Sequence, residues 1–325
     1  MIRRILGPAV VVCVLLQLPA GAGLRAQEAL VVPEGLPDWT FNIPDKEQPA
    51  AFRPQGMVRA LGSAREYDAK KIAGTANPPD WFPDEHPPAP QAVTGGEGTG
   101  IRFACGACHL MSGQSHSEAA DIAGMPAGYL VRQMAYYRSG ARRDDARMGP
   151  IAKATSDEDV RAAAAYFAAL KPGVFVKVIE TATPPRTFIA TLGRHRQLHP
   201  EGGTEAIGHR ILEIPADPMR TELRDPHSGF IAYVPPGSVA RGEALVGGEG
   251  SGVACATCHG ADLRGAGEVP RLAGQQPLYI ARQLFDLKSG SSAGEAAAAM
   301  KPVVASLSED DIIAISAYLG SLSPQ

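Results

Sequence analysis

The stretch Cys105-Gly106-Ala107-Cys108-His109 recurs 150 residues later as Cys255-Ala256-Thr257-Cys258-His259. Both have the pattern C-x-x-C-H, the attachment signature of c-type haem. Two thiols three positions apart can add to the two vinyl groups of one haem, and the imidazole of the next residue can then bind the iron. A single C-x-x-C-H motif has two alternatives, a disulfide and a zinc site. A disulfide would involve only the two thiols. The Cys pairs of a zinc site usually recur within about 20 residues, not 150. Two complete copies therefore predict two covalently bound haem c groups, with thioethers at Cys105, Cys108, Cys255 and Cys258 and with His109 and His259 as iron ligands.

The similarity between the two copies extends well beyond the motifs. Residues 129–134 (YLVRQM) match residues 279–284 (YIARQL) at the same offset of 150, and residues 156–159 (SDED) match residues 308–311 (SEDD). A serine followed by acidic residues is typical of a helix N-terminus. Apolar residues then follow in both copies at the three- and four-residue spacing of a buried helix face. Each copy is therefore predicted to be one helical haem domain.

Methionine supplies the best candidate for the second iron ligand. Met148 lies 39 residues after His109 and Met300 lies 41 residues after His259, and each methionine is followed two positions later by proline. Met300 is the last methionine of the chain, and no histidine follows His259. The first copy holds further candidates, which have no counterpart in the second: Met111, Met125, Met134 and His116. Since a thioether binds haem iron well and raises its reduction potential, we predict Met148 and Met300 as axial ligands.

The N-terminus has the features of an export signal. Residues 1–26 begin with paired arginines, continue with a short apolar stretch that contains Cys13, and end in small residues, so cleavage is expected after Ala22 or Ala26. The apolar stretch is shorter than the roughly 20 residues that span a bilayer, although an uncleaved anchor is an alternative. Removal of residues 1–26 takes away three arginines and changes the net charge from −3 to −6. We expect a periplasmic, acidic protein without an integral membrane segment, and no nucleic-acid partner.

The sequence is divided into five expected segments. They are a signal peptide (1–26), a proline-rich N-terminal segment (27–95), a first haem domain (96–172), an interdomain segment (173–237) and a second haem domain (238–325). The N-terminal segment is expected to be an extended, non-helical wrap over the first domain. The interdomain segment is expected to contain short strands near residues 174–179, 210–214 and 230–234. The predicted fold class is mainly α, with irregular and partly β connecting segments.

Both copies resemble class I c-type cytochrome domains, and the pair resembles exported di-haem cytochromes. The resemblance covers residues 96–172 and 238–323, through C-x-x-C-H, the Tyr-x-x-Arg-Gln helix, Met-x-Pro and the capped C-terminal helix. It implies the transfer of single electrons between a donor dehydrogenase or quinol-oxidising complex and a terminal acceptor oxidase or cytochrome. It also implies haem contacts for four further residues, which in the alternative interpretation only pack helix against helix: Tyr129, Gln133, Tyr279 and Gln283.

The same resemblance implies that a proline after the motif orients the axial histidine. The carbonyl of Pro270 would accept a hydrogen bond from His259, and Arg271 would face a haem propionate. The first copy has Ala120 and Asp121 at these positions. The first copy therefore leaves the orientation of its histidine and the neutralisation of its propionates open, and we expect its reduction potential to differ from that of the second copy.

Two other functions compete with a simple carrier. A di-haem cytochrome c peroxidase has a similar length and two C-x-x-C-H motifs, but it needs an iron that can open a coordination site to peroxide. The two matched methionines argue against it, and we expect no enzymatic activity. The cytochrome subunit of a dehydrogenase complex is the second alternative. A thiosulfate-oxidising enzyme with a thiolate-ligated iron fits poorly, since haem attachment uses all four cysteines that remain after cleavage.

Overall fold

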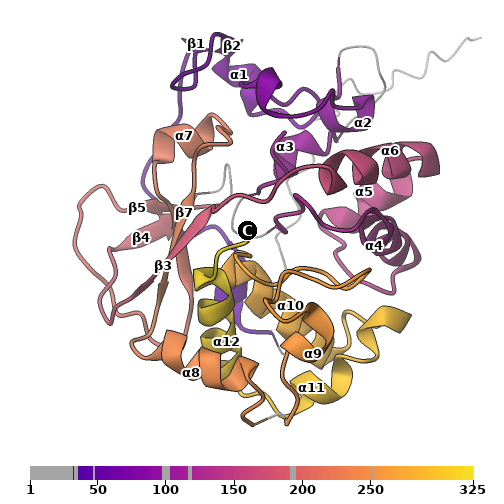
Figure 1. Ribbon diagram of the computed structural model, residues 1–325. Coiled ribbons are helices and arrows are strands. Elements are labelled where there is room, and N and C mark those ends of the chain that lie inside the picture. Colours follow the sequence, from indigo (N-terminus) through magenta and orange to yellow (C-terminus); the bar gives the residue numbers. More distant parts are fainter. Residues whose placement is uncertain are drawn as a thin grey trace, which may run out of the picture. The chain divides into compact units, whose positions relative to one another are not determined.

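The computed structural model describes residues 32, 36–46, 48–96, 103–115, 119–190, 195–250 and 252–325. The predicted signal peptide, Cys13 and His116 lie outside these residues. The fold is mainly helical, with short strands between the two repeats, as predicted (Figure 1). Among the described residues, no helix combines the length and the hydropathy that a membrane crossing requires.

The two repeats have the same order of helices. The first contains α3 (Gly106–His109), α4 (Ala127–Ser139), α5 (Met148–Ala154) and α6 (Asp157–Ala168), and it is preceded by α2 (Gln91–Thr94). The second contains α8 (Ser238–Val246), α9 (Ala256–His259), α10 (Pro277–Ser289), η3 (Glu295–Ala297), α11 (Lys301–Ala305) and α12 (Glu309–Ser321). Each haem motif thus forms a single helical turn ahead of the long helix α4 or α10.

The predicted helix caps are present at the C-terminal helices. The Ser156 side chain accepts a hydrogen bond from the main-chain nitrogen of Asp159 at the start of α6. Ser308 does the same with Asp311 at the start of α12, and the Asp311 side chain accepts in return from the Ser308 nitrogen. Such reciprocal bonds satisfy amide groups that have no partner within the helix. Local sequence therefore sets where both helices begin.

The leading helix differs between the repeats. In the second repeat, α8 packs along α12 and approaches it closely at Gly242, where a Cβ would lie 2.0 Å from the main-chain oxygen of Ala314. In the first repeat, only the four residues of α2 take this place. The connection to the motif is nevertheless the same, because the Cys105 nitrogen donates to Ala92 and the Cys255 nitrogen donates to Val246, both at 2.9 Å.

The interdomain segment forms a small mixed sheet. Strand β7 (Phe230–Val234) pairs in parallel with β3 (Val176–Glu180) and antiparallel with β6 (Leu212–Pro215), with Val176 opposite Phe230 and Leu212 opposite Tyr233. These strands match the three that the sequence predicts. A second pair, β4 (Thr187–Ile189) and β5 (Arg196–Leu198), and the short helix α7 (Pro218–Glu222) were not predicted.

The N-terminal segment is irregular, with short elements only. They are η1 (Asp38–Thr40), β1 (Met57–Val58), β2 (Tyr67–Asp68), α1 (Ala69–Ile72) and η2 (Pro83–Glu85). Its first part does not cover the first repeat, contrary to expectation. Trp39 packs edge-on against Phe285 of α10 and donates from Nε1 to Glu309 of α12 at 2.7 Å. The Trp39 indole therefore packs against the second repeat, where it contacts an aromatic ring and a carboxylate.

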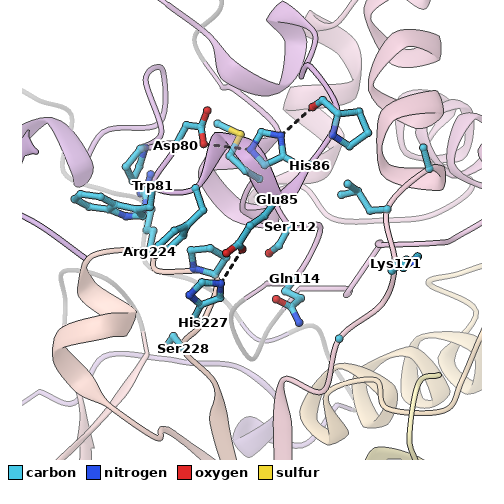
Figure 2. Close-up of a pocket in the computed structure, with 18 of the residues that line it drawn as sticks. Asp80, Trp81, Glu85, His86, Ser112, Gln114, Lys171, Arg224, His227 and Ser228 are labelled. Atoms are coloured by element: carbon cyan, nitrogen blue, oxygen red, sulfur yellow. Dashed lines mark hydrogen bonds and ion pairs between the residues drawn. The ribbon is translucent and has the colours of Figure 1, made fainter. Parts of the chain in front are cut away.

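The later part of the N-terminal segment meets the first repeat and the interdomain segment around a cavity. The cavity measures about 600 Å³ and is lined by Trp81, His86, Ser112, Arg224 and His227, among others (Figure 2). His86 pairs with Asp80 at 3.2 Å, and His227 pairs with Glu85 at 2.7 Å. None of the four described cysteines lines the cavity, which lies beside the first haem motif and not within it.

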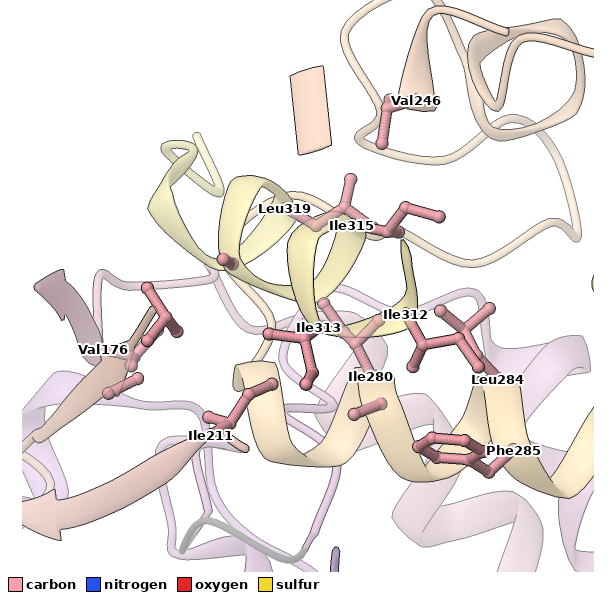
Figure 3. Close-up of a cluster of buried hydrophobic side chains, with 14 of the residues drawn as sticks. Val176, Ile211, Val246, Ile280, Leu284, Phe285, Ile312, Ile313, Ile315 and Leu319 are labelled. Atoms are coloured by element: carbon pink, nitrogen blue, oxygen red, sulfur yellow. The ribbon is translucent and has the colours of Figure 1, made fainter. Parts of the chain in front are cut away.

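The largest hydrophobic cluster surrounds α12. Ile315 and Leu319 lie toward Val246 of α8, whereas Ile312 and Ile313 lie toward α10 and the β3 strand (Figure 3). All four side chains are buried. Burial of one such side chain contributes about 1.5–3 kcal/mol, so this cluster is a major source of stability in the second repeat.

Candidate haem-binding sites

Each haem motif begins at a cysteine that precedes a one-turn helix. Cys105 is the N-cap residue of α3 and Cys255 is the N-cap residue of α9. The main-chain nitrogen of each motif's histidine donates to the main-chain oxygen of its first cysteine, at 2.9 Å in the first repeat and 3.0 Å in the second. Cys105, Cys108, Cys255 and Cys258 are all free thiols, so the disulfide alternative finds no support among the described cysteines.

Both predicted axial histidines are oriented by a main-chain carbonyl eleven residues downstream. His259 Nδ1 lies 2.8 Å from the oxygen of Pro270, and His109 Nδ1 lies 3.0 Å from the oxygen of Ala120. A carbonyl only accepts, so Nδ1 carries the proton and the Nε2 lone pair stays available for a metal. The contact that orients His259 is therefore also present at His109, for which the sequence left the orientation open. The carbonyl provides the contact, and a proline ring is not required for it.

Burial shapes the protonation of the motif residues. It lowers the pKa of His109 and of His259, although the hydrogen bonds to the carbonyls oppose this. It also raises the pKa of Cys105 to about 12 and raises that of Cys255. Burial raises the pKa of Cys108 as well, and the positive charges of Arg224 and Arg147 counteract it. The imidazoles are therefore neutral at pH 7, as iron ligation requires.

Arg271 lies where the two repeats touch. It is buried, and its Nη1 donates to the oxygen of Ala273 at 2.6 Å and its Nη2 to the oxygen of Asp121 at 3.3 Å. Its Nε is buried without a hydrogen-bond partner. An unsatisfied, charged donor in the interior is costly, and a carboxylate such as a haem propionate would satisfy it. Arg271 is thus suited to the role that the sequence predicts for it.

The predicted haem-lining residues converge on a residue that the sequence did not single out. Arg142 is buried and donates to Gln133 of its own repeat at 2.6 Å, and to Gln283 and Tyr279 of the other, the latter at 3.1 Å. Tyr129, the counterpart of Tyr279, also lies near this guanidinium. Arg142 and Ser292, which occupy equivalent positions, form an antiparallel bridge. The sequence signal that could have drawn attention to Arg142 is that the equivalent position of the second repeat is a serine.

The predicted methionine ligands lie at equivalent places in the two repeats. Met148 is the first residue of α5, and Met300 is the N-cap residue of α11. Met300 packs against the same hydrophobic cluster as Cys255. Among the rival methionines, Met111 is buried beside Gly106 and lines the cavity of Figure 2, and Met125 is also buried.

The donor set of each repeat fits a covalently bound haem. It offers two free thiols, a neutral imidazole with an open Nε2, and a repeat-matched thioether. The second repeat adds an unsatisfied guanidinium nitrogen. Among the described residues, no group of three or more His, Cys, Asp or Glu side chains is arranged to hold a bare metal ion.

The proteins that this chain is similar to include several cytochromes. The family model described as cytochrome c matches residues 239–323. A thiosulfate dehydrogenase electron acceptor of Thiomonas intermedia is 28% identical over 226 residues, which cover 68% of this chain and 80% of the relative. A cytochrome c4 of Pseudomonas aeruginosa is 29% identical over 67% of this chain and 83% of its own length.

A shorter relative and a solved structure complete the comparison. Cytochrome c-554(548) of Halomonas halodenitrificans is 35% identical over 86 residues, which are 26% of this chain and 96% of the relative. The crystal structure of reduced recombinant cytochrome c4 from Pseudomonas stutzeri aligns with a TM-score of 0.45 and 24% identity, over 67% of this chain and 93% of that one. The sequence relatives confirm the predicted haem c cofactor. The chain therefore belongs to the cytochrome c family, as a di-haem class I cytochrome c.

Proposed function

We propose that this protein carries single electrons between redox partners in the periplasm, with one haem in residues 96–172 and one in residues 238–325. His109 and Met148 are the proposed axial ligands of the first iron, and His259 and Met300 those of the second. The observation that carries the proposal is the repeated imidazole geometry, in which Nδ1 faces a carbonyl at 3.0 Å in one repeat and 2.8 Å in the other. Two matched ligand sets are what a two-centre carrier needs.

Bound haem supplies a reversible one-electron centre at its iron. The protein contributes the rest. The carbonyls of Ala120 and Pro270 fix the ring orientation of the two histidines and increase the basicity of their Nε2 atoms. A methionine sulfur as the second ligand raises the reduction potential and closes the iron to small oxidants. The four thioether links hold the haems in a chain whose individual domains have small cores.

The donor is proposed to be a dehydrogenase or quinol-oxidising complex, and the acceptor an oxidase or another cytochrome. One relative bears the name thiosulfate dehydrogenase electron acceptor, which supports a dehydrogenase as donor. Membership of a dehydrogenase complex is the second candidate, for the same reason. A di-haem peroxidase has less support, because it requires an open iron site and the two repeats each offer a methionine at the matched position.

A redox titration with optical spectroscopy of wild type, Met148→Ala and Met300→Ala tests the ligation. Each substitution is expected to remove about half of the long-wavelength band of methionine-ligated ferric haem and to lower one of two potentials. Met134→Leu is the matched control, since Leu284 stands at the equivalent position of the second repeat. The ligand assignment is wrong if neither alanine variant differs from the control. Rapid turnover of peroxide by the reduced protein would favour the peroxidase.

A further inference from the structure

We propose that redox partners exchange electrons with this protein through the second repeat, at the open face of its haem motif around Val253, Thr257 and Cys258. The corresponding face of the first repeat is closed by the N-terminal and interdomain segments. The inference rests on the proposed function and adds to it the place where the partner docks, the kind of partner, and the order in which the two haems exchange electrons.

The two motifs differ in exposure at equivalent positions. In the first repeat, Ala104, Gly106 and Ala107 are buried and Cys108 is half-buried. In the second repeat, Ala254 and Ala256 are half-buried, and Thr257 and Cys258 are exposed. The residue before each of these stretches is equally accessible, at 40% for Phe103 and 43% for Val253. The difference therefore begins at Ala104 and Ala254, directly before the first cysteine of each motif, and continues through the residues that would carry the thioether edge of the haem.

The first cover of the motif comes from residues 73–76. The Ala104 nitrogen donates to the oxygen of Thr75 at 2.8 Å, and the Gly96 nitrogen donates to that of Ala76 at 3.2 Å. The chain approaches so closely that a Cβ at Gly95 would lie 1.7 Å from the Ala76 oxygen, and the backbone there has a φ of +65°. Glycine is required at such a position. This segment is thus fixed to the first motif by its main chain.

The second cover comes from Arg224 of the interdomain segment. Its Nη1 donates to the oxygen of Gly74 at 2.7 Å, and its charge acts on the Cys108 thiol. The backbone of Arg224 has a φ of 54°, unusual for a residue with a side chain. The neighbouring Leu223 oxygen accepts from Trp81 Nε1 at 2.7 Å. Two chain segments are therefore tied to each other next to the first thioether edge.

The open face of the second repeat carries a modest negative charge. Glu249 before the motif is exposed, and so is Asp262 after it, while Arg264 pairs with Asp262 at 3.4 Å. Among Glu249, Asp262 and Arg264, the carboxylates therefore outnumber the positive charges by one. The partner that suits such a face is a one-electron redox protein with lysines or arginines around its own cofactor. Attraction between the opposite charges speeds the association of the two proteins at low salt.

Electron flow then has a fixed order. A partner that gives one electron would itself be oxidised by one electron, and the haem that His259 and Met300 would hold would take up that electron at its iron. The first repeat exchanges its electron with the second, within the molecule. No proton or group is transferred in either step. Discharge to an acceptor reverses the order.

Stopped-flow oxidation of the reduced holoprotein by a tripositive cobalt(III) phenanthroline complex tests the docking face. Val253→Lys places a positive charge at the open edge, so the second-order rate constant is expected to fall about fivefold or more at low salt and to recover at high salt. Phe103→Lys is the matched control, because it changes the equivalent, equally exposed position. It is expected to alter the rate constant less than twofold. Ferricyanide is expected to show the opposite sign with Val253→Lys.

Several results would overturn the proposal. A larger effect of Phe103→Lys than of Val253→Lys would place the exchange at the first repeat. Equal rates in all three proteins would place it elsewhere on the surface. An oxidation rate of the wild type by the cobalt complex that rises with salt concentration would contradict a basic partner. If neither complex oxidised the reduced protein in any variant, the proposed electron-carrier function would be wrong. An error in the ligand assignment alone would be seen only in the redox titration of the methionine variants.

Discussion

Arg271 Nη2 lies 3.3 Å from the main-chain oxygen of Asp121, and these two residues occupy equivalent positions of the two repeats. Each follows the residue whose carbonyl orients the axial histidine of its own repeat, Ala120 in one and Pro270 in the other. Gln275 strengthens the contact, since its Nε2 donates to the same Asp121 oxygen at 2.8 Å. A path of peptide and hydrogen bonds therefore joins the two imidazoles across the contact between the repeats.

The Asp121 carboxyl makes stability depend on pH. Burial raises its pKa to about 7, although hydrogen bonds from Ser115 and the charge of Arg271 oppose this. Because the folded state holds this proton more tightly than the unfolded state, the stabilisation is complete at pH values below about 4 and is lost as the pH rises through about 7. Asp121→Asn keeps the acceptor for Ser115 and removes the ionisation.

The free energy of unfolding of Asp121→Asn, relative to wild type, is expected to rise by about 2 kcal/mol between pH 5 and pH 8. Urea titrations at the two pH values measure it. Asp157→Asn is the control, because Arg138 lowers the pKa of that exposed carboxyl and no gain at high pH is expected. A difference that stays constant with pH would show that Asp121 is ionised in the folded state throughout this range.

The equivalence of Ala120 and Pro270 predicts that the proline ring is dispensable for histidine orientation. Pro270→Ala keeps the carbonyl that accepts from His259. We expect the second reduction potential to stay within the error of the titration, and stability to fall by about 0.4–1 kcal/mol because the unfolded chain gains freedom. A large shift of that potential in Pro270→Ala would mean that the ring itself positions the imidazole.

Much of the fold could be predicted because its signals are local. The cysteine spacing identified both motifs, and the serine-acid patterns placed the starts of α6 and α12. The position of Trp39 on α10 and the role of Arg142 were not predictable, because each depends on contacts between segments far apart in sequence. The orientation of His109 stayed open for a related reason. Any residue supplies a carbonyl, so the absence of proline carried no information about the hydrogen bond.

The cap of α12 provides a test of the local signals. Ser308→Ala removes the hydroxyl that accepts from the Asp311 nitrogen at 3.1 Å and one half of the reciprocal pair. A loss of about 1–2 kcal/mol in the free energy of unfolding is expected. Ser323→Ala, near the C-terminus, is the control and should cost less than about 0.5 kcal/mol. Equal losses in the two variants would show that packing alone fixes the start of α12.

Arg142 is expected to be the residue on which the contact between the repeats depends most. Its guanidinium donates to Gln133 and Gln283 and to the Tyr279 hydroxyl, and it lies 4.7 Å from the centre of the Tyr137 ring. Arg142→Ala leaves these half-buried acceptors without their donor and removes a buried side chain, which is expected to cost about 3 kcal/mol in the free energy of unfolding.

The neighbouring Arg143 provides the control for this substitution. Its side chain is exposed, and its contact with the second repeat uses the main-chain nitrogen, which donates to Ser291 at 2.9 Å. Arg143→Ala should therefore change stability by less than about 0.5 kcal/mol in the same urea titration. Arg142→Lys separates charge from geometry, because one ammonium group cannot reach acceptors on both repeats as a planar guanidinium does. If Arg142→Lys were as stable as wild type, the positive charge and not the forked hydrogen bonding would hold the repeats together.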